Sequence, residues 1–396
     1  MKKVVYIYIY LFLSLCIVVA CNRNTVVTIH NLQKGRLHAT HELVECGEKT
    51  FELDSVSAPK AIYMQFLKMG GRNVLSFLNT YNASLYFYDY DTNEHISTYC
   101  FKQDFGNEIR KPGAYYIANE DSVFILDMAK MNLAILDYKK NLLLDKISLK
   151  GDEEKDWPSR LPQYNLCTAN PIFRVENRIV LTGQLFWSIP SSEIETFLFS
   201  ASIDVSSSDV KFYHCYPHEL YGQDSNWEGG LQTTPYATVS PYGDFVYSFP
   251  PSHDLYIAKP YSNTYKKVYG GSNYAENISS IDYQEKRETP QNMVLENYVQ
   301  QDMYGPILYD QYQGVYYRFI YERLSNQQRS NSISDKNISI IVVDEDFHYL
   351  GEKRIGTGKN WNVRNSFVTQ EGLNIEYLSP ANQDEDYIVF KVFQLK

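Results

Sequence analysis

Short segments rich in aromatic and β-branched residues recur from Thr50 to the end of the chain. Gly, Asn, Asp, Pro and Ser separate these segments, a texture typical of β-strands joined by turns. The segments fall into six groups, at residues 74–101, 114–149, 172–215, 236–269, 307–354 and 366–394. Each group with its loops is about 40–60 residues long, which is the size of a propeller blade.

The last group contains only three clear strands. The run KTFELDSV, Lys49–Val56, precedes the first group and could supply the fourth strand, which would lock a ring and remove its exposed edges. The sequence therefore predicts an all-β fold, a single β-propeller over residues 49–396 with six four-stranded blades closed by N- and C-terminal strands. Five or seven blades remain open. A pair of β-sandwich domains is the competing architecture, but it requires a central linker that the sequence does not show.

Several groups carry an Asp at the end of their third strand, after two apolar residues. These are Asp89, Asp137 and Asp344, with Asp204 as a looser copy. Such an Asp is expected to accept hydrogen bonds from turn amides. Asp89 also opens a run that resembles a calcium loop, but the sixth position is Glu94 instead of Gly, and the twelfth is Cys100 instead of Glu. The run is therefore interpreted as a hairpin.

The N-terminus has the features of a lipoprotein signal peptide, predicted over residues 1–20. Lys2 and Lys3 precede an apolar run, Val4 to Val19, that is too short for a comfortable membrane span. Small residues then lead to Cys21, a pattern that resembles the lipobox of bacterial lipoproteins. Lipidation of Cys21 would hold the protein on a membrane. Asn22 follows where Asp would resemble an inner-membrane retention signal, so the expected location is the outer membrane of the cell envelope, in either leaflet.

Lys2 and Lys3 are the only charged residues of the signal peptide. Its removal therefore leaves 35 basic and 47 acidic residues, a net charge of −12. This balance argues against nucleic acid as a partner. Residues 21–48 are polar and are predicted to form a tether, and an insertion near 271–303 is predicted to contain a short helix. The scattered Cys residues of the mature chain contain no CxxC pair and are expected to be buried free thiols.

Two stretches carry a family resemblance. The first is Leu75–Asn79 followed by Asn82–Tyr90, and the second is Val239–Asp244 with its SP-x-G turn, followed by Ser248–Pro250 and Leu255–Ile257. With these motifs, residues from about 50 to 396 resemble a family of uncharacterised lipoproteins of gut-dwelling bacteria related to the TolB-like six-bladed propellers. The resemblance implies the propeller and the envelope location. It carries no catalytic motif that could be transferred to this chain.

Metal and catalytic motifs are weak. His214, Cys215, His218 and Glu219 could begin a metal site, but Pro217 disfavours the helix that would gather them. The cluster HATHELVEC at residues 38–46 lies in the predicted tether. The chain has no G-x-S-x-G, H-E-x-x-H or phosphate-loop motif, and we predict no catalytic residue, metal or cofactor.

Aromatic residues in loops are the remaining candidates for ligand contacts. Trp157 and Trp227 lie beside turn-forming residues, and exposed Trp side chains bind sugars and peptides. The leading hypothesis is a membrane-anchored binding or scaffolding module for a protein, peptide or glycan. The alternative is a propeller enzyme, a glycan hydrolase or lyase, with catalytic residues dispersed over several blades. A funnel with converging carboxylates or histidines would favour the enzyme, and an apolar surface would favour binding.

Overall fold

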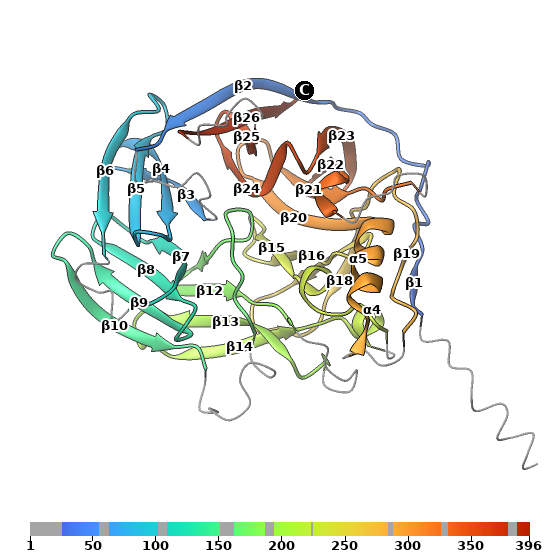
Figure 1. Ribbon diagram of the computed structural model, residues 1–396, viewed down its shortest axis with the longest axis horizontal. Coiled ribbons are helices and arrows are strands. Elements are labelled where there is room, and N and C mark those ends of the chain that lie inside the picture. The colour runs from blue at the N-terminus through green and yellow to red at the C-terminus, as the bar shows by residue number, and fades with distance from the viewer. Residues whose placement is uncertain are drawn as a thin grey trace, which may run out of the picture.

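Six four-stranded antiparallel sheets surround a common axis, and each forms one blade of a β-propeller (Figure 1). The protein is described by a computed structural model over residues 26–54, 63–101, 109–150, 162–186, 194–222, 225–283, 288–325, 332–378 and 386–396. The predicted fold class, with six blades and closure by both ends of the chain, is confirmed.

Within each blade the strands follow one another from the axis outward. Blade 1 contains β3 (Met64–Met69), β4 (Arg72–Asn79), β5 (Ser84–Asp89) and β6 (His95–Cys100). Blade 2 contains β7 (Pro112–Ile117), β8 (Ser122–Asp127), β9 (Asn132–Asp137) and β10 (Leu142–Ser148). Blade 3 contains β11 (Phe173–Val175), β12 (Arg178–Thr182), β13 (Leu198–Asp204) and β14 (Val210–Cys215).

The second half of the ring repeats this plan. Blade 4 contains β15 (Tyr236–Val239), β16 (Phe245–Ser248), β17 (Asp254–Ala258) and β18 (Lys266–Tyr269). Blade 5 contains β20 (Met303–Asp310), β21 (Val315–Tyr321), β22 (Asn337–Asp344) and β23 (Tyr349–Thr357). Blade 6 contains β24 (Trp361–Thr369), β25 (Gly372–Tyr377) and β26 (Tyr387–Leu395), with β2 (Leu43–Glu52) as its outer strand.

Strand β2 closes the ring by pairing with β26 along its whole length, from Leu43 opposite Leu395 to Glu52 opposite Tyr387. Its Phe51 side chain is buried against Phe390 and Tyr88, and so joins blade 6 to blade 1. The strand begins at Leu43, six residues before the predicted start at Lys49. A bulge between Glu45 and Gly47 shifts the register, and the pairing continues on both sides of it.

The segment before β2 differs from the predicted tether of residues 21–48. From Val26 onward it follows the outer rim of blades 4 and 5 as far as β2 (Figure 1). Strand β1 (Thr28–Ile29) pairs with β19 (Ile278–Ser279), and further along the His41 amide donates to the Leu350 carbonyl in β23. We call residues 26–42 the rim strap. Polar composition suggested a free tether, but the backbone of the strap and the Asn31 side chain form hydrogen bonds to the propeller.

The repeated Asp residues have the predicted role. The carboxylates of Asp89, Asp137, Asp204 and Asp344 each accept at least one backbone N–H of the following turn, at 2.8–3.1 Å. These amides favour the charged form, and the pKa of Asp89 and of Asp204 lies below its ordinary value chiefly for this reason. The hairpin interpretation of residues 84–101 is confirmed by the pairing of β5 with β6.

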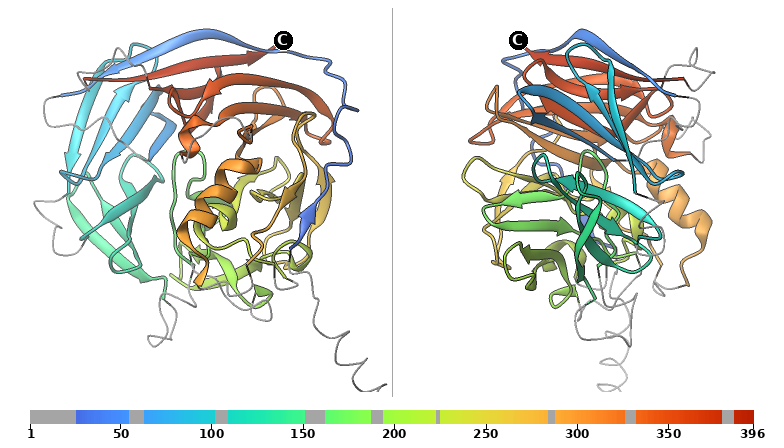
Figure 2. Two further views of the ribbon diagram at one scale, coloured as in Figure 1. Left: turned by 45° about the vertical axis from the view of Figure 1, so that its right-hand side comes forward. Right: turned by 90° about the vertical axis from the view of Figure 1, so that its left-hand side faces the viewer.

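The helices within the described residues are short and lie outside the blades. They are α4 (His218–Tyr221), α5 (Gln291–Gln300) and the 3-10 turns η1 (Gly230–Thr233) and η3 (Ile333–Asp335). Helix α5 lies in the segment 271–303 and covers one face of the ring (Figure 2, right). Its buried residues Val294 and Tyr298 are one turn apart and pack on Ile281. Among the described residues, no helix has the length and apolar character needed to cross a bilayer.

Candidate functional site: the axial pocket

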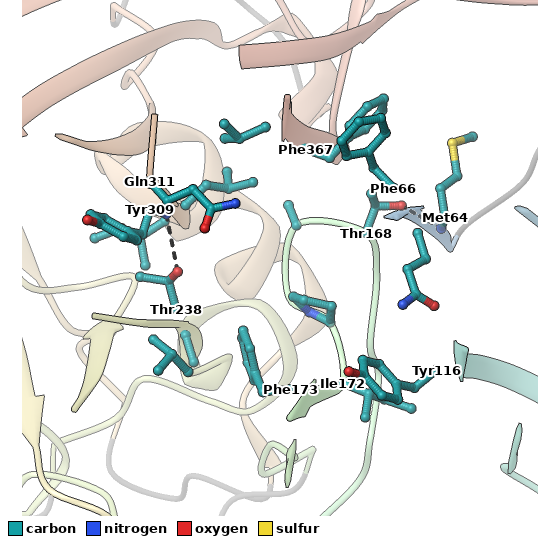
Figure 3. A pocket seen from close by; sticks show the side chains of 18 of the residues that line it. Met64, Phe66, Tyr116, Thr168, Ile172, Phe173, Thr238, Tyr309, Gln311 and Phe367 are labelled. Atoms are coloured by element: carbon teal, nitrogen blue, oxygen red, sulfur yellow. Dashed lines mark hydrogen bonds between the residues drawn. The ribbon is translucent and has the colours of Figure 1, made fainter. Parts of the chain in front are cut away.

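A pocket of about 340 Å³ lies on the propeller axis, where the first strands of all six blades face one another. The labelled side chains in Figure 3 surround this space from every side of the ring. Blades 1, 2 and 3 contribute Phe66, Tyr116 and Phe173. In the same way, Thr238 comes from blade 4, Tyr309 from blade 5 and Phe367 from blade 6. We call this space the axial pocket.

Residues 162–172, which precede β11, cross the channel and form one wall of the axial pocket. The Thr168 hydroxyl accepts the Met64 amide of blade 1 at 2.9 Å and donates to the Asn365 side chain of blade 6 at 2.9 Å. The Asn170 side chain accepts the Ala237 amide of blade 4 at 2.9 Å. Because blades 1 and 4 lie opposite each other in a six-bladed ring, this segment is fastened across the axis.

The wall of the axial pocket is aromatic and aliphatic. Phe66 and Phe367 lie with ring centroids 6.1 Å apart and nearly parallel planes, with buried Met64 near them, and buried Ile172 lies across the pocket beside Tyr116 (Figure 3). Among the described residues that line the pocket, none is Asp, Glu, His, Cys, Lys or Arg. The pocket therefore suits a ligand group that is uncharged and mostly apolar.

Most polar groups of the lining are already bonded to the protein. The Gln65 amide accepts the Ile117 N–H at 2.8 Å and donates to the Ile117 carbonyl at 3.2 Å, which joins β3 to β7. The Thr238 hydroxyl accepts the Tyr309 amide at 3.2 Å, drawn as a dashed line in Figure 3. The exposed side chains of Gln311 and Tyr312 lie at the mouth and are available to a ligand. The site thus offers few hydrogen bonds and a large apolar contact.

Two tyrosine hydroxyls at the axial pocket stay protonated at neutral pH. Burial raises the pKa of Tyr116, and nearby Arg174 opposes that shift. Burial and the Glu345 carboxylate, which accepts the hydroxyl hydrogen bond, raise the pKa of Tyr309 to about 12. Both groups are therefore neutral donors, consistent with an uncharged site.

A second, more polar groove of about 550 Å³ lies between blades 3 and 4 and shares Val239 with the axial pocket. Its lining includes exposed Tyr242 and Tyr261. Its lining also includes the charged residues Arg174, Glu176 and Arg178. Of these, Arg178 is paired with Asp204 at 3.2 Å and bonded to the Ser202 carbonyl at 2.9 Å. The groove is thus a ledge beside the axial pocket whose Arg178 is committed to the blade.

Of the two predicted ligand contacts, Trp227 does not line the axial pocket. Trp227 is buried, with 2% of its surface exposed, and its indole N–H donates to the Leu220 carbonyl at 2.7 Å. The expectation of an exposed indole at this position is therefore wrong, because the loop that carries it is packed into the core. Trp157 and Cys21 lie outside the described residues.

The His and Cys clusters do not converge. His214 is buried, with Nδ1 2.6 Å from the Tyr247 hydroxyl and Nε2 3.1 Å from the Lys259 carbonyl. Burial lowers the pKa of His214 to about 4, so its ring is neutral. His218 lies on the surface instead, 3.8 Å from Glu195. No group of three His, Cys, Asp or Glu side chains that could hold a metal ion occurs within the described part of the chain.

The four described Cys residues are free, as predicted, but only Cys167 and Cys215 are buried. Cys46 is exposed on β2, and Cys100 is half-buried at the end of β6. The expectation of burial is wrong for Cys46 because β2 is the outermost strand of its blade.

Several buried ionisable groups were not found from the sequence, among them Arg318, Lys336 and Glu376. Arg318 is completely buried between blades 4 and 5. Lys336 is also completely buried and donates to the Tyr298 and Gln301 carbonyls at the C-terminus of α5. Glu376 accepts the side-chain amides of Asn362 and Asn365, and burial raises its pKa to about 7. All three are bonded into the scaffold.

The comparisons agree with this architecture. Residues 40–354 match the model of the family described as "Domain of unknown function (DUF4221)". The chain belongs to the DUF4221 family. A crystal structure of a DUF4221 member from Bacteroides vulgatus is similar, with a TM-score of 0.75 and 18% identity over 90% of this chain and 99% of that one.

A second similar structure is a protein of Bacteroides fragilis that its name predicts to be exported. It has a TM-score of 0.52 and 9% identity over 92% of this chain and 98% of that one. At these identities both structures show the fold alone. No curated protein matches this chain in sequence.

Proposed function

We propose that this DUF4221 protein is a non-enzymatic binding module of the bacterial cell envelope, and that it holds an uncharged, largely apolar group of a peptide or protein partner in the axial pocket. One observation carries this proposal: six blades and the segment 162–172 enclose an aromatic and aliphatic space with no charged residue in its described lining. Burial of apolar surface contributes about 25 cal/mol per Å², so such a wall favours apolar side chains.

A peptide fits better than a glycan because the axial pocket offers few groups for hydrogen bonding. A sugar brings hydroxyls on every side, and each buried hydroxyl without a partner costs about 1–3 kcal/mol. The Gln65 and Thr238 side chains are already bonded within the protein. The described lining also contains no carboxylate to act as the acid and base pair of a glycan hydrolase, and the Tyr116 and Tyr309 hydroxyls, whose pKa values are raised by burial, stay protonated and do not supply a base.

The envelope location rests on the sequence before the propeller, where Cys21 follows small residues as in a lipobox. Acylation of Cys21 would anchor the protein through its lipid chains. The variant Cys21→Ala should move the protein from the membrane fraction to the soluble fraction. Retention of this variant in the membrane fraction would contradict lipid anchoring.

Binding is tested with small probes of defined charge. N-acetyl-L-tryptophanamide presents a neutral aromatic group on a peptide unit, with N-acetyl-L-tryptophan as its charged analogue and N,N′-diacetylchitobiose as a neutral sugar. At about 0.3 kcal/mol per non-hydrogen atom, the amide should bind with a Kd of about 0.1 mM. Saturation-transfer NMR and calorimetry should show binding of the amide at least tenfold tighter than that of the other two probes.

A matched pair of variants locates the site. Gln311→Trp places a large side chain at the mouth of the axial pocket, whereas Gln313→Trp changes an exposed residue of the same turn that does not line it. The first variant should weaken binding of N-acetyl-L-tryptophanamide at least tenfold and the second should leave it unchanged. Equal effects of both variants, or tighter binding of the sugar, would contradict the proposal.

A further inference from the structure

The rim strap carries a small exposed surface with both apolar and basic residues. Two turns, residues 31–36 of the strap and 272–276 after β18, are joined by hydrogen bonds. The Asn31 side chain donates to the Ser272 and Ala275 carbonyls at 2.9 Å, and the Gly35 amide donates to the Asn273 carbonyl at 2.9 Å. These bonds hold the two turns together as one unit on the rim.

Large apolar side chains project from both turns. Leu32 is 73% exposed and Tyr274 is 64% exposed, although their neighbours Asn31 and Ala275 are buried. A Leu and a Tyr held outward by a fixed backbone resemble the anchors of proteins that rest on a bilayer, where apolar groups enter the interface and Tyr lies at headgroup level.

The charge around this unit also suits a membrane. Residues 22–41 contain Arg23, Lys34 and Arg36 and no Asp or Glu. The other 32 basic residues of the mature chain face 47 acidic ones, a net charge of −15 for the rest of the protein. Lys34 pairs with Glu276 at the edge of the unit. The stretch 22–41 is therefore attracted to anionic headgroups, whereas the rest of the acidic protein is repelled; the strap itself ends at Glu42, which pairs with Lys353.

The length of the chain places this unit near the anchor. The first described residue, Val26, is five residues after Cys21, so an extended chain spans at most about 18 Å between them. Strand β1 follows at once and is fixed to β19 on the rim of the ring (Figure 2, left). A lipidated Cys21 therefore cannot hold the propeller far from the bilayer.

We infer that the joined turns 31–36 and 272–276 rest on the lipid surface through Leu32 and Tyr274, so that the propeller stands with the rim of blades 4 and 5 toward the membrane. This inference rests on the proposed lipid anchoring. It extends that proposal by assigning an orientation, in which neither face of the ring is pressed against the bilayer and the mouth of the axial pocket stays open to a partner.

Fluorescence quenching by spin-labelled lipids tests the orientation in the lipidated full chain. A fluorophore is attached to Leu32→Cys, Tyr274→Cys or Tyr81→Cys after the accessible Cys46 and Cys100 are replaced by Ser. Tyr81 is 68% exposed in blade 1, on the opposite side of the ring from β1, and so serves as the matched control. The vesicles contain phosphatidylethanolamine and phosphatidylglycerol.

Labels at positions 32 and 274 should be quenched at least twofold more strongly than the label at 81. Equal quenching at all three positions, or stronger quenching at 81, would overturn the orientation. Lipid anchoring itself is measured separately by flotation of the vesicles on a density gradient. A wild-type chain that does not float with the vesicles contradicts the anchor, whereas a chain that floats but has unquenched labels contradicts only the orientation.

Discussion

Removal of the Arg318 guanidinium should greatly destabilise the propeller. This completely buried group in β21 donates to the Ser248 hydroxyl at 2.9 Å, to the His253 and Gly270 carbonyls at 3.0 Å and to the Ser252 carbonyl at 2.7 Å. All four acceptors belong to blade 4 or its end, so Arg318 fastens that blade to blade 5. Its charged centre also lies 3.8 Å from the centroid of a neighbouring aromatic ring, that of Tyr304.

The variant Arg318→Met keeps an apolar stem but removes the donor that these four acceptors share. The His253 carbonyl keeps the Gly270 N–H and the Ser248 hydroxyl keeps the Gly305 carbonyl, so the Ser252 and Gly270 carbonyls lose most. Each buried polar group without a partner costs about 1–3 kcal/mol. Part of this cost is offset because the variant no longer buries a charge, whose desolvation lowers the pKa of Arg318 to about 10. We therefore expect the free energy of unfolding to fall by about 4 kcal/mol.

Urea unfolding at 25 °C, followed by tryptophan fluorescence, measures this loss as a lower midpoint at unchanged slope. The matched control is Arg354→Met, because Arg354 is 59% exposed and pairs with Glu322 on the surface. Exposed ion pairs contribute at most about 1 kcal/mol, so the control should unfold close to wild type. If the two variants lie within about 1 kcal/mol of each other, the assignment of Arg318 as an inter-blade fastening is refuted.

Three further predictions concern other buried groups. Burial raises the pKa of Glu376 from 4.5 to about 7, so between these pH values the folded protein holds a proton on this carboxyl that the unfolded chain releases. The contribution of Glu376 to stability is therefore complete below about pH 4.5 and is lost as the pH rises to 7. Glu376→Gln should therefore stabilise the fold by about 2–3 kcal/mol at pH 8 and leave it nearly unchanged at pH 4.5, and equal effects on urea midpoints at both pH values would contradict this. Trp227→Phe should lower the free energy of unfolding by about 1–3 kcal/mol, because the Leu220 carbonyl loses its donor. The variant should leave the Kd of N-acetyl-L-tryptophanamide unchanged, and a higher Kd would show that Trp227 is a ligand contact after all. In the native protein a thiol reagent should modify exposed Cys46 but not buried Cys167, which should react only after unfolding. Mass spectrometry of the labelled peptides measures the order of reaction, and labelling of Cys167 before Cys46 would contradict this prediction.

Much of the ring could be predicted because its signals are local. The alternation of strands and turns, and Asp89 and Asp344 as turn caps, depend on neighbours within a few residues. Even the closing strand could be found, since the last group lacked one strand. Its start at Leu43 was missed because Glu45, Gly47 and Glu48 break the strand pattern there, and their partners in β26 lie about 350 positions away.

The axial pocket could not be predicted because it is assembled from distant positions. Thr168 bonds to residues 104 and 197 positions away, and no local pattern marks such contacts. Trp227 was misread because its polar neighbours suggested an exposed loop, whereas the loop is packed inward. Arg318 did leave a signal: a single cation within the apolar strand VYYRFIY indicates a buried, fully bonded charge.

A crystal structure of the protein with N-acetyl-L-tryptophanamide tests the central claim most directly. The crystals are grown with the probe at about ten times its measured Kd. The account predicts the indole on the axis, between Phe66 and Phe367 on one side and Thr238 and Tyr309 on the other, with the amide end toward Gln311. An axial pocket without the probe, in a protein that binds it in solution, would show that the binding site of this DUF4221 protein lies elsewhere.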